Sequence, residues 1–297
     1  MRLGIDLGGT KTEIIALADD GSELLRQRIP TPRCDYMATI MAIAGLVENA
    51  ENELGRRGRV GIGIPGAESL ATGLIKNANS TCLIGKPLRR DLQALLQREV
   101  RLANDANCFA LSEAVDGSGR DADIVFGIIL GTGVGGGIVI HRQVLTGANA
   151  IAGEWGHNPL PLPAGDDLPL PRCYCGRAGC IEAYLSGPAL ADDHRRHTGQ
   201  TLTADEIDRL AASGDPDCEA SLGRYEERLG RALAGVINLL DPQVIVIGGG
   251  LSNMQRLYRN LPECCGRHVF SDVFNTQFRP PLHGDSSGVR GAAWLWD

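Results

Sequence analysis

The sequence lacks the features that mark membrane, secreted and nucleic-acid-binding proteins. Its 297 residues contain no apolar run near the ~18–20 residues that a membrane-spanning helix needs. No basic-then-apolar leader precedes the first apolar strand, which starts at Leu3, so we expect a cytoplasmic protein. The formal net charge of -7 argues against a surface that follows a phosphate backbone. We therefore expect neither a nucleic-acid partner nor a membrane partner.

A P-loop of the form G-x-x-x-x-G-K-[ST] is also missing, which excludes the P-loop nucleotide-binding proteins. Gly131–Gly136 contains G-x-G-x-x-G, but this pattern leads into an apolar strand rather than a helix, so we reject a dinucleotide site. The composition is otherwise that of a globular protein, with 43% hydrophobic and 22% charged residues. The length suits two compact cores better than one.

What the chain does contain is a repeated α/β pattern. Apolar residues between Ile40 and Leu54 recur at three- and four-residue spacing, which predicts an amphipathic helix. Val244–Ile247 is wholly apolar, as expected for a parallel strand covered on both faces. The pattern Gly-Ile-x-Leu-Gly occurs at Gly4–Gly8 and again at Gly127–Gly131, each time before a glycine-rich turn and a second strand. The repeat indicates a duplicated α/β unit with a ligand cleft between its two lobes.

Three glycine clusters end apolar strands, at Gly8–Lys11, Gly131–Gly133 and Gly248–Gly250. Glycine lets backbone N–H groups approach a phosphate closely. Each cluster alone is equally well a tight turn, but three together favour nucleotide binding. Asp6, at the tip of the first strand, is a candidate for holding Mg²⁺ through water. The predicted ATP-binding residues are Gly4, Ile5, Asp6, Leu7, Gly8, Gly9, Thr10, Lys11, Gly131, Thr132, Gly133, Val134, Gly135, Gly136, Gly137, Gly249 and Gly250.

A cluster of cysteines predicts a structural zinc site. Cys173, Cys175 and Cys180 form Cys-x-Cys-Gly-x-x-Gly-Cys, and His157 lies upstream in Gly-Glu-Trp-Gly-His. Three thiolates and one imidazole fill the tetrahedral set of a structural zinc ion. Because no position is left for water, we expect zinc to organise a loop rather than to activate a nucleophile. The alternative is three unrelated buried cysteines in a reducing cell, for which this spacing is too tight.

The chain resembles the ROK family of bacterial sugar kinases and repressors. The resemblance runs in order from residue 3 to Trp296 and is carried by Asp6–Lys11, Asn104–Asn107, Gly153–His157 and Cys173–Glu182. It implies the actin-like ATPase (ribonuclease H-like) fold, an α/β fold with two duplicated lobes around a cleft. The expected lobes are residues 1–117 plus 284–297, with the C-terminal helix packed back, and residues 118–283, with the zinc loop.

The same resemblance implies the roles of the site residues. Asp105 is the expected catalytic base for a sugar hydroxyl that attacks the γ-phosphate of Mg-ATP. His157 is expected to place one ring nitrogen on zinc and the other toward the sugar. Judged alone, Asn104–Asn107 is also a good helix N-cap sequence, and Asn107 as the cap would leave Asp105 facing the cleft. The expected sugar-binding residues are Gly66, Asn79, Asn104, Asp105, Glu154, His157 and Glu182.

Two segments bear on the choice of sugar. Lys76–Thr81 and Glu154–Pro159 resemble the fructokinase branch of the family, so we expect D-fructose to be converted to fructose 6-phosphate, with mannose also accepted. Leu130–Gly137 resembles the N-acetylglucosamine kinase branch as well, and glucose is a third alternative. From the family we also expect a homodimer.

A non-catalytic sugar sensor or transcriptional regulator is the alternative of a different class. The repressors of the family carry a winged helix-turn-helix ahead of the first glycine motif, which here begins at residue 4. Asp6, Lys11 and Asp105 are all present, which favours the kinase.

Overall fold

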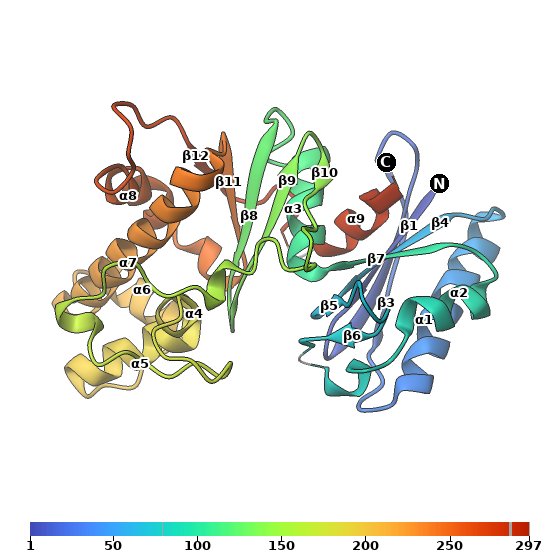
Figure 1. Ribbon diagram of the computed structural model, residues 1–297, viewed down its shortest axis with the longest axis horizontal. Helices are drawn as coiled ribbons and strands as arrows, with labels where there is room; N and C mark the ends of the chain where they lie inside the picture. Colours follow the sequence, from blue (N-terminus) through green and yellow to red (C-terminus); the bar gives the residue numbers. More distant parts are fainter. Residues whose placement is uncertain (79, 285–286, 297) are drawn as a thin grey trace. The chain divides into compact units, whose positions relative to one another are not determined.

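The computed structural model describes residues 1–78, 80–284 and 287–296, and its chain forms two compact units (Figure 1). Unit 1 comprises Met1–Arg120, Gly137–Ala152 and Leu282–Asp297, and unit 2 comprises Asp121–Gly136 and Gly153–Pro281. Residues 137–152, which the sequence reasoning assigned to the second lobe, pack within unit 1. The two units need not coincide with the lobes expected above, so the lobe boundaries remain a prediction.

Unit 1 is built on a five-stranded sheet with the order β3-β2-β1-β4-β7. Its strands are β1 (Arg2–Leu7), β2 (Lys11–Leu17), β3 (Glu23–Pro30), β4 (Arg59–Ile64) and β7 (Val100–Asn104). β1, β2 and β3 are antiparallel neighbours, whereas β4 lies parallel to β1 and to β7. The carboxyl ends of the parallel strands therefore meet at one edge, where Asp6 and Asn104 lie.

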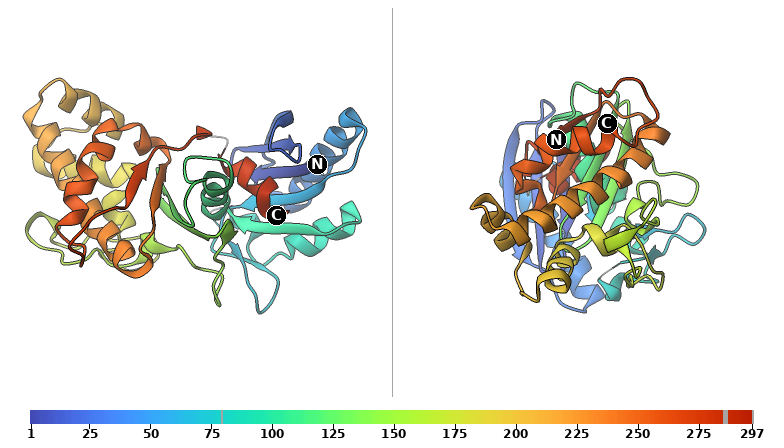
Figure 2. Two further views of the ribbon diagram at one scale, coloured as in Figure 1. Left: turned by 90° about the horizontal axis from the view of Figure 1, so that it is seen from above. Right: turned by 90° about the vertical axis from the view of Figure 1, so that its left-hand side faces the viewer.

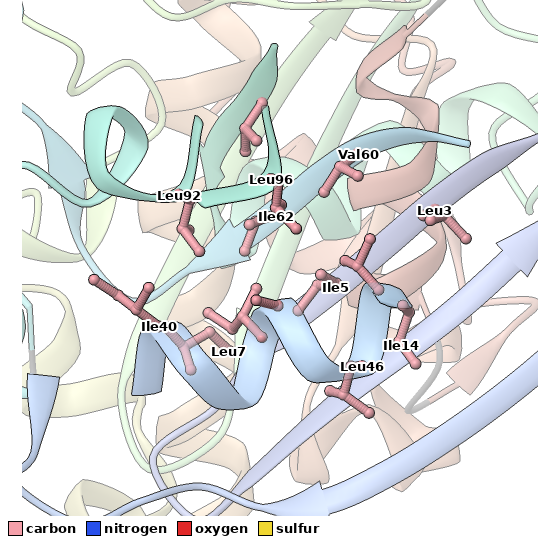
Figure 3. Close-up of a cluster of buried hydrophobic side chains, with 14 of the residues drawn as sticks. Leu3, Ile5, Leu7, Ile14, Ile40, Leu46, Val60, Ile62, Leu92 and Leu96 are labelled. Carbon is pink, nitrogen blue, oxygen red and sulfur yellow. The ribbon is translucent and has the colours of Figure 1, made fainter. Parts of the chain in front are cut away.

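Side chains alternate across β1, so each face of this sheet has its own covering helices. Leu3, Ile5 and Leu7 are buried in a hydrophobic cluster with α1 and α2 (Figure 3). α9 lies on the opposite face, where it contacts β1, β4 and α3 (Figure 1). The bounds of these helices are α1 (Tyr36–Leu54), α2 (Leu88–Leu96), α3 (Asp105–Val115) and α9 (Ser287–Ala293). The helix predicted over Ile40–Leu54 is confirmed as part of α1.

Glycines let α9 and α3 pack closely in unit 1. A Cβ on Gly4 or on Gly61 would overlap a backbone carbonyl oxygen of α9, from Val289 or Ala292 respectively. A Cβ on Gly291 of α9 would overlap the carbonyl oxygen of Cys108 in α3. The three positions must therefore lack a side chain for α9 to pack between the sheet and α3.

The second sheet has the order β10-β9-β8-β11-β12. Its strands are β8 (Ile124–Leu130), β9 (Val134–Ile140), β10 (Gln143–Val144), β11 (Val244–Gly248) and β12 (Gln277–Arg279). The apolar strand predicted at Val244–Ile247 is confirmed, since β11 is buried and lies parallel to both β8 and β12. The two Gly-Ile-x-Leu-Gly segments lie on β1 and β8 and run into the turns that follow them.

Five helices belong to unit 2, and the yellow-to-orange helices of Figure 2 pack against one another there. They are α4 (Glu182–Leu185), α5 (Gly187–Thr198), α6 (Ala204–Ala212), α7 (Pro216–Leu240) and α8 (Gln255–Gly266). The short elements of the chain are β5 (Ala67–Glu68), β6 (Ile75–Lys76), η1 (Thr81–Leu83), η2 (Trp155–His157), η3 (Gly165–Asp167), η4 (Gly250–Asn253) and η6 (Trp294–Trp296). Among the helices of the described residues, none is long and apolar enough to cross a membrane.

The close packing of α9 gives a first prediction. We expect Gly61→Ala to destabilise the fold by about 1–3 kcal/mol, because the added Cβ would push β4 away from α9. The matched control is Gly45→Ala in α1, where the added Cβ has no neighbour within 4 Å beyond the backbone of its own helix. Chemical denaturation of both variants measures the difference, and equal stabilities would contradict this account of Gly61.

Candidate active site

The residue predicted as the catalytic base lies at the start of α3. Asn104 is the N-cap of this helix, and its Oδ1 accepts the backbone N–H of Ala106 at 2.9 Å. The Asn104 Nδ2 group donates to the carbonyl oxygen of Gly66 at 3.0 Å. The capping residue is thus Asn104 and not Asn107, which lies inside α3. Asp105 is the first residue of α3 and lies between Asn104 and Ala106, which the capping hydrogen bond joins.

The Asp6 carboxyl lies in an unusual electrostatic environment. Burial and the nearby Asp105 carboxylate raise the pKa of Asp6 to about 6, and Glu13 acts in the same direction. Lys11 and Arg28 oppose this rise. Two neighbouring acidic groups that repel each other form a place where Mg²⁺ would be held by one or two carboxylates and water.

The first predicted phosphate-binding cluster is a closed turn. The N–H of Gly8 donates to the carbonyl oxygen of Lys11 at 3.0 Å, and the next three residues are exposed. Gly9 and Thr10 also line a pocket of about 330 Å³ in unit 1. The cluster is therefore a closed turn that leaves Thr10 and Lys11 at the surface, and its role in nucleotide binding stays a prediction.

A second pocket joins the other two glycine clusters within unit 2. It has a volume of about 290 Å³, and its walls include Gly131, Thr132 and Gly250. The remaining walls come from the starts of α5 and α6 and from Leu251. Sequence reasoning missed these wall residues, which are Gly187, Pro188, Thr203, Ala204, Asp205 and Leu251.

The sequence did contain a signal for the wall residues at the starts of α5 and α6. Ser186 caps α5 with Pro188 in its first turn, and Thr203 with Glu206 forms a capping box at α6. Both motifs mark helix starts, but only the fold places them beside the turn at Gly131.

The four predicted zinc ligands lie together. Their ligand atoms are all within 4.8 Å of one another. His157 Nδ1 is 3.6 Å from Cys173 Sγ, and Cys175 Sγ is 3.6 Å from Cys180 Sγ. These separations and the donor types fit a tetrahedral zinc ion. Gly176 and Gly179 have φ values of 89° and 78°, so the turn between the cysteines depends on glycine.

The thiols of this cluster differ in acidity. Burial raises the pKa of Cys180 to about 12, whereas the hydrogen bonds from Arg177 lower the pKa of Cys175 to about 6. A metal held here would bind both as thiolates, and its uptake would release the Cys180 proton.

The long segment between His157 and Cys173 is anchored by buried ion pairs. The Asp167 carboxylate accepts from Arg228 Nε and from the Arg231 guanidinium, both at 2.7 Å. Arg228 also donates to Asp193 on α5 at 2.8 Å. The carbonyl oxygen of Asp167 accepts the Tyr184 hydroxyl at 2.8 Å, which ties the segment to α4.

α4 in turn carries a predicted sugar-binding residue. Glu182 is its first residue, and its Oε2 accepts the backbone N–H of Val134 at 2.9 Å. Trp155, two residues before His157, donates from Nε1 to the carbonyl oxygen of Gly135 at 2.9 Å. The segment that leads into His157 and the start of α4 are thus both joined to β9, the strand after the Gly131–Gly133 turn.

The structure also brings in a residue that the sequence did not single out. Tyr174 lies between Cys173 and Cys175, and its hydroxyl is 3.0 Å from His157 Nε2. Sequence reasoning directed this ring nitrogen toward a sugar. Another predicted sugar-binding residue, Asn79, lies outside the described residues.

Comparison with known proteins identifies the family. The model of the ROK family matches residues 2–297, and the chain belongs to this family. The chain is 44% identical over 299 residues to an N-acetyl-D-glucosamine kinase of Salmonella typhimurium, with 99% of each protein covered. It is 41% identical to an N-acetyl-D-glucosamine kinase of Yersinia pseudotuberculosis, with 99% of this chain and 98% of the relative covered.

Two solved structures agree with this assignment. The ROK hexokinase of Thermus thermophilus has a TM-score of 0.87 and 33% identity, covering 99% of this chain and 96% of that one. The ROK glucokinase of Streptomyces griseus, in complex with glucose and AMPPNP, has a TM-score of 0.78 and 27% identity, covering 99% and 98%. The predicted actin-like ATPase fold is confirmed, and the protein is an ATP-dependent hexose kinase of the ROK family. The predicted fructokinase branch is not supported by these relatives, which favour the N-acetylglucosamine alternative.

The zinc cluster gives the second prediction. We expect Cys180→Ser to lose bound zinc and sugar affinity together, because zinc would fix the segment between His157 and the start of α4. Zinc is measured by elemental analysis and sugar affinity by calorimetry. Cys34→Ser, at an exposed thiol outside the cluster, is the control and should keep both. Sugar affinity that survives in the zinc-free variant would break the proposed link.

The third prediction concerns Asp6. Its folded-state pKa of about 6 exceeds the ordinary 3.8, so metal-free protein should lose stability as the pH rises through this interval. We expect Asp6→Asn to match the wild type near pH 4 and to exceed its stability near pH 7.5, by up to about 3 kcal/mol. The same variant should bind Mg-nucleotide more weakly. Denaturation at the two pH values, with nucleotide titrations beside it, tests both, and a stability difference independent of pH would contradict the assignment.

Proposed function

We propose that this protein is an ATP-dependent N-acetyl-D-glucosamine kinase, which transfers the γ-phosphate of ATP to a hydroxyl of the sugar. The observation that carries the proposal is the similarity to N-acetyl-D-glucosamine kinases at 44% and 41% identity over nearly the whole chain. The local geometry of Asp105, of the glycine turns and of the cysteine cluster is compatible with this activity.

In the proposed reaction Asp105 is the general base. A carboxylate is ionised at neutral pH and accepts the proton that the attacking hydroxyl releases. The hydrogen bond from Asn104 to Gly66 fixes the start of α3, so the base is positioned before the sugar arrives. Phosphoryl transfer depends mainly on such positioning and on charge neutralisation.

The nucleotide is assigned to the glycine turns. Gly8–Lys11 offers exposed hydroxyl and ammonium donors, and the pocket at Gly131, Thr132 and Gly250 lies beside the starts of α5 and α6. Mg²⁺ would be held at Asp6 through water and would neutralise charge on the transferred phosphoryl group. The zinc ion would be structural, with His157, Cys173, Cys175 and Cys180 as its ligands.

The sugar hydroxyls are assigned to polar side chains that the family resemblance implies. They are Asn104, Asp105, Glu154, His157 and Glu182, together with the segment at Gly66. Each buried sugar hydroxyl needs a partner, and this set of carboxylates, amide and imidazole provides both acceptors and donors.

Glucose is the second candidate substrate, because the similar glucokinase of Streptomyces griseus is described in complex with glucose. Fructose and mannose, expected from the segments at Lys76–Thr81 and Glu154–Pro159, are further test substrates. The homodimer expected from the family remains a prediction.

The fourth prediction is a substrate panel with a variant of the base. Purified protein is assayed for ADP release with Mg-ATP and, separately, N-acetylglucosamine, glucose, mannose and fructose. We expect the highest kcat/KM with N-acetylglucosamine. Asp105→Asn should lower kcat by about 10²–10⁴-fold, as expected for loss of a general base.

The control for this variant is Asp272→Asn, which makes the same chemical change at an exposed carboxylate outside the proposed site. It should retain activity, and both variants should melt near the wild-type temperature. Preference for glucose or fructose would keep the kinase and change its substrate. Folded, zinc-loaded protein that turns over no sugar would instead support the sugar sensor.

A further inference from the structure

Tyr174, between Cys173 and Cys175, contacts His157 but has no role in the proposed reaction. The Tyr174 side chain is 76% exposed, so packing in a core does not account for its orientation. Its ring nevertheless meets the His157 ring edge to face, with centroids 5.2 Å apart and an interplanar angle of 79°. The hydroxyl reaches His157 Nε2 at 3.0 Å. Tyr174 therefore contacts the imidazole although most of it is exposed to solvent.

The direction of that hydrogen bond follows from the other ring nitrogen. His157 Nδ1 faces Cys173 Sγ at 3.6 Å, on the side of the cysteine cluster. A metal bound through Nδ1 leaves the imidazole proton on Nε2. Nε2–H then donates, the Tyr174 oxygen accepts, and the tyrosine O–H remains available to a further acceptor.

The Tyr174 hydroxyl contacts one of the side chains of unit 2 to which we assign the sugar, His157. It offers one donor and an accepting oxygen, the same hydrogen-bonding groups as a sugar hydroxyl.

We propose that Tyr174 is a specificity-determining residue. Its hydroxyl oxygen accepts a hydrogen bond from the Nε2–H of His157 in the sugar-free protein, and a bound sugar must replace it as the acceptor. The inference rests on the proposed function, because it takes His157 as a sugar-binding residue. A sugar gains this bond only when it presents an accepting oxygen at the place of the tyrosine hydroxyl. Sugars without such an oxygen leave Tyr174 in place and bind more weakly.

The backbone around Tyr174 limits the change to the side chain. The N–H of Cys173 donates to the carbonyl oxygen of Arg177 at 2.8 Å, and the N–H of Gly176 donates to that of Cys173 at 3.0 Å. This closed turn stays in place when an exposed side chain rotates. Displacement of the tyrosine therefore costs about one hydrogen bond, which corresponds to a factor of about 2–10 in affinity.

The test is Tyr174→Phe, which keeps the ring and removes the hydroxyl. Calorimetry with N-acetylglucosamine in the absence of nucleotide should give a Kd about 2–10-fold lower than that of the wild type. KM for the sugar should fall by the same factor, with kcat and zinc content unchanged. Long-range ¹⁵N–¹H spectra should show the His157 Nε2–H resonance shifted in the sugar-free variant and close to the wild-type position once sugar is bound.

Tyr174→Ser is the second variant, because serine is too short to reach Nε2 and should give the same tightening. The control is Tyr36→Phe, which removes a hydroxyl bonded to Asp91 in unit 1 and should leave sugar affinity unchanged. Unchanged or weaker sugar binding in both Tyr174 variants overturns the proposal. A wild-type protein that phosphorylates no sugar instead overturns the proposed function, so the two failures are distinguishable. If glucose is the substrate, the same comparison is made with glucose.

Discussion

The local structure of unit 2 depends on one buried cation. Arg228 of α7 is 2% exposed and joins Asp167, in the segment between His157 and Cys173, to Asp193 of α5. Breaking a buried ion pair by removing one partner costs about 3–5 kcal/mol, so α7 strongly constrains this segment. The carbonyl oxygen of Asp167 accepts a hydrogen bond from the Tyr184 hydroxyl. The ion pairs therefore also constrain the helix that begins at Glu182. The position of the Glu182 carboxylate is therefore set by ion pairs as well as by the cysteine cluster.

A single amide has the corresponding role in unit 1. Asn104 accepts from the first turn of α3 and donates to the loop at Gly66, so one side chain fixes two segments of the proposed sugar site. Close beside it, burial keeps the pKa of Asp6 near 6, a cost to the free protein that a bound cation would relieve. Both units thus hold their polar groups in place before any ligand binds, as preorganised catalysis requires.

Much of the fold and part of the site were predictable from the sequence. Residues that act through local geometry were found by pattern: the apolar period of α1 and the apolar strand β11. The four clustered residues His157, Cys173, Cys175 and Cys180 were found because their spacing is itself the signal, and zinc binding there stays a prediction. Tyr174 was missed because an exposed tyrosine between two cysteines has no pattern of its own. The choice of sugar was also beyond the sequence motifs, since pocket shape decides a difference of one substituent.

The sequence by itself determined the strand and helix order, the positions of the glycine turns and the donor set of the metal cluster, since these depend on neighbours within a few residues. Only the tertiary structure decided which helix starts meet the Gly131 turn, that Asn104 rather than Asn107 is the cap, and that Tyr174 faces His157. Each of these depends on where separate segments lie in space. That placement is set by the packing of whole elements, such as α9 against the glycines of β1 and β4, and no local pattern encodes it.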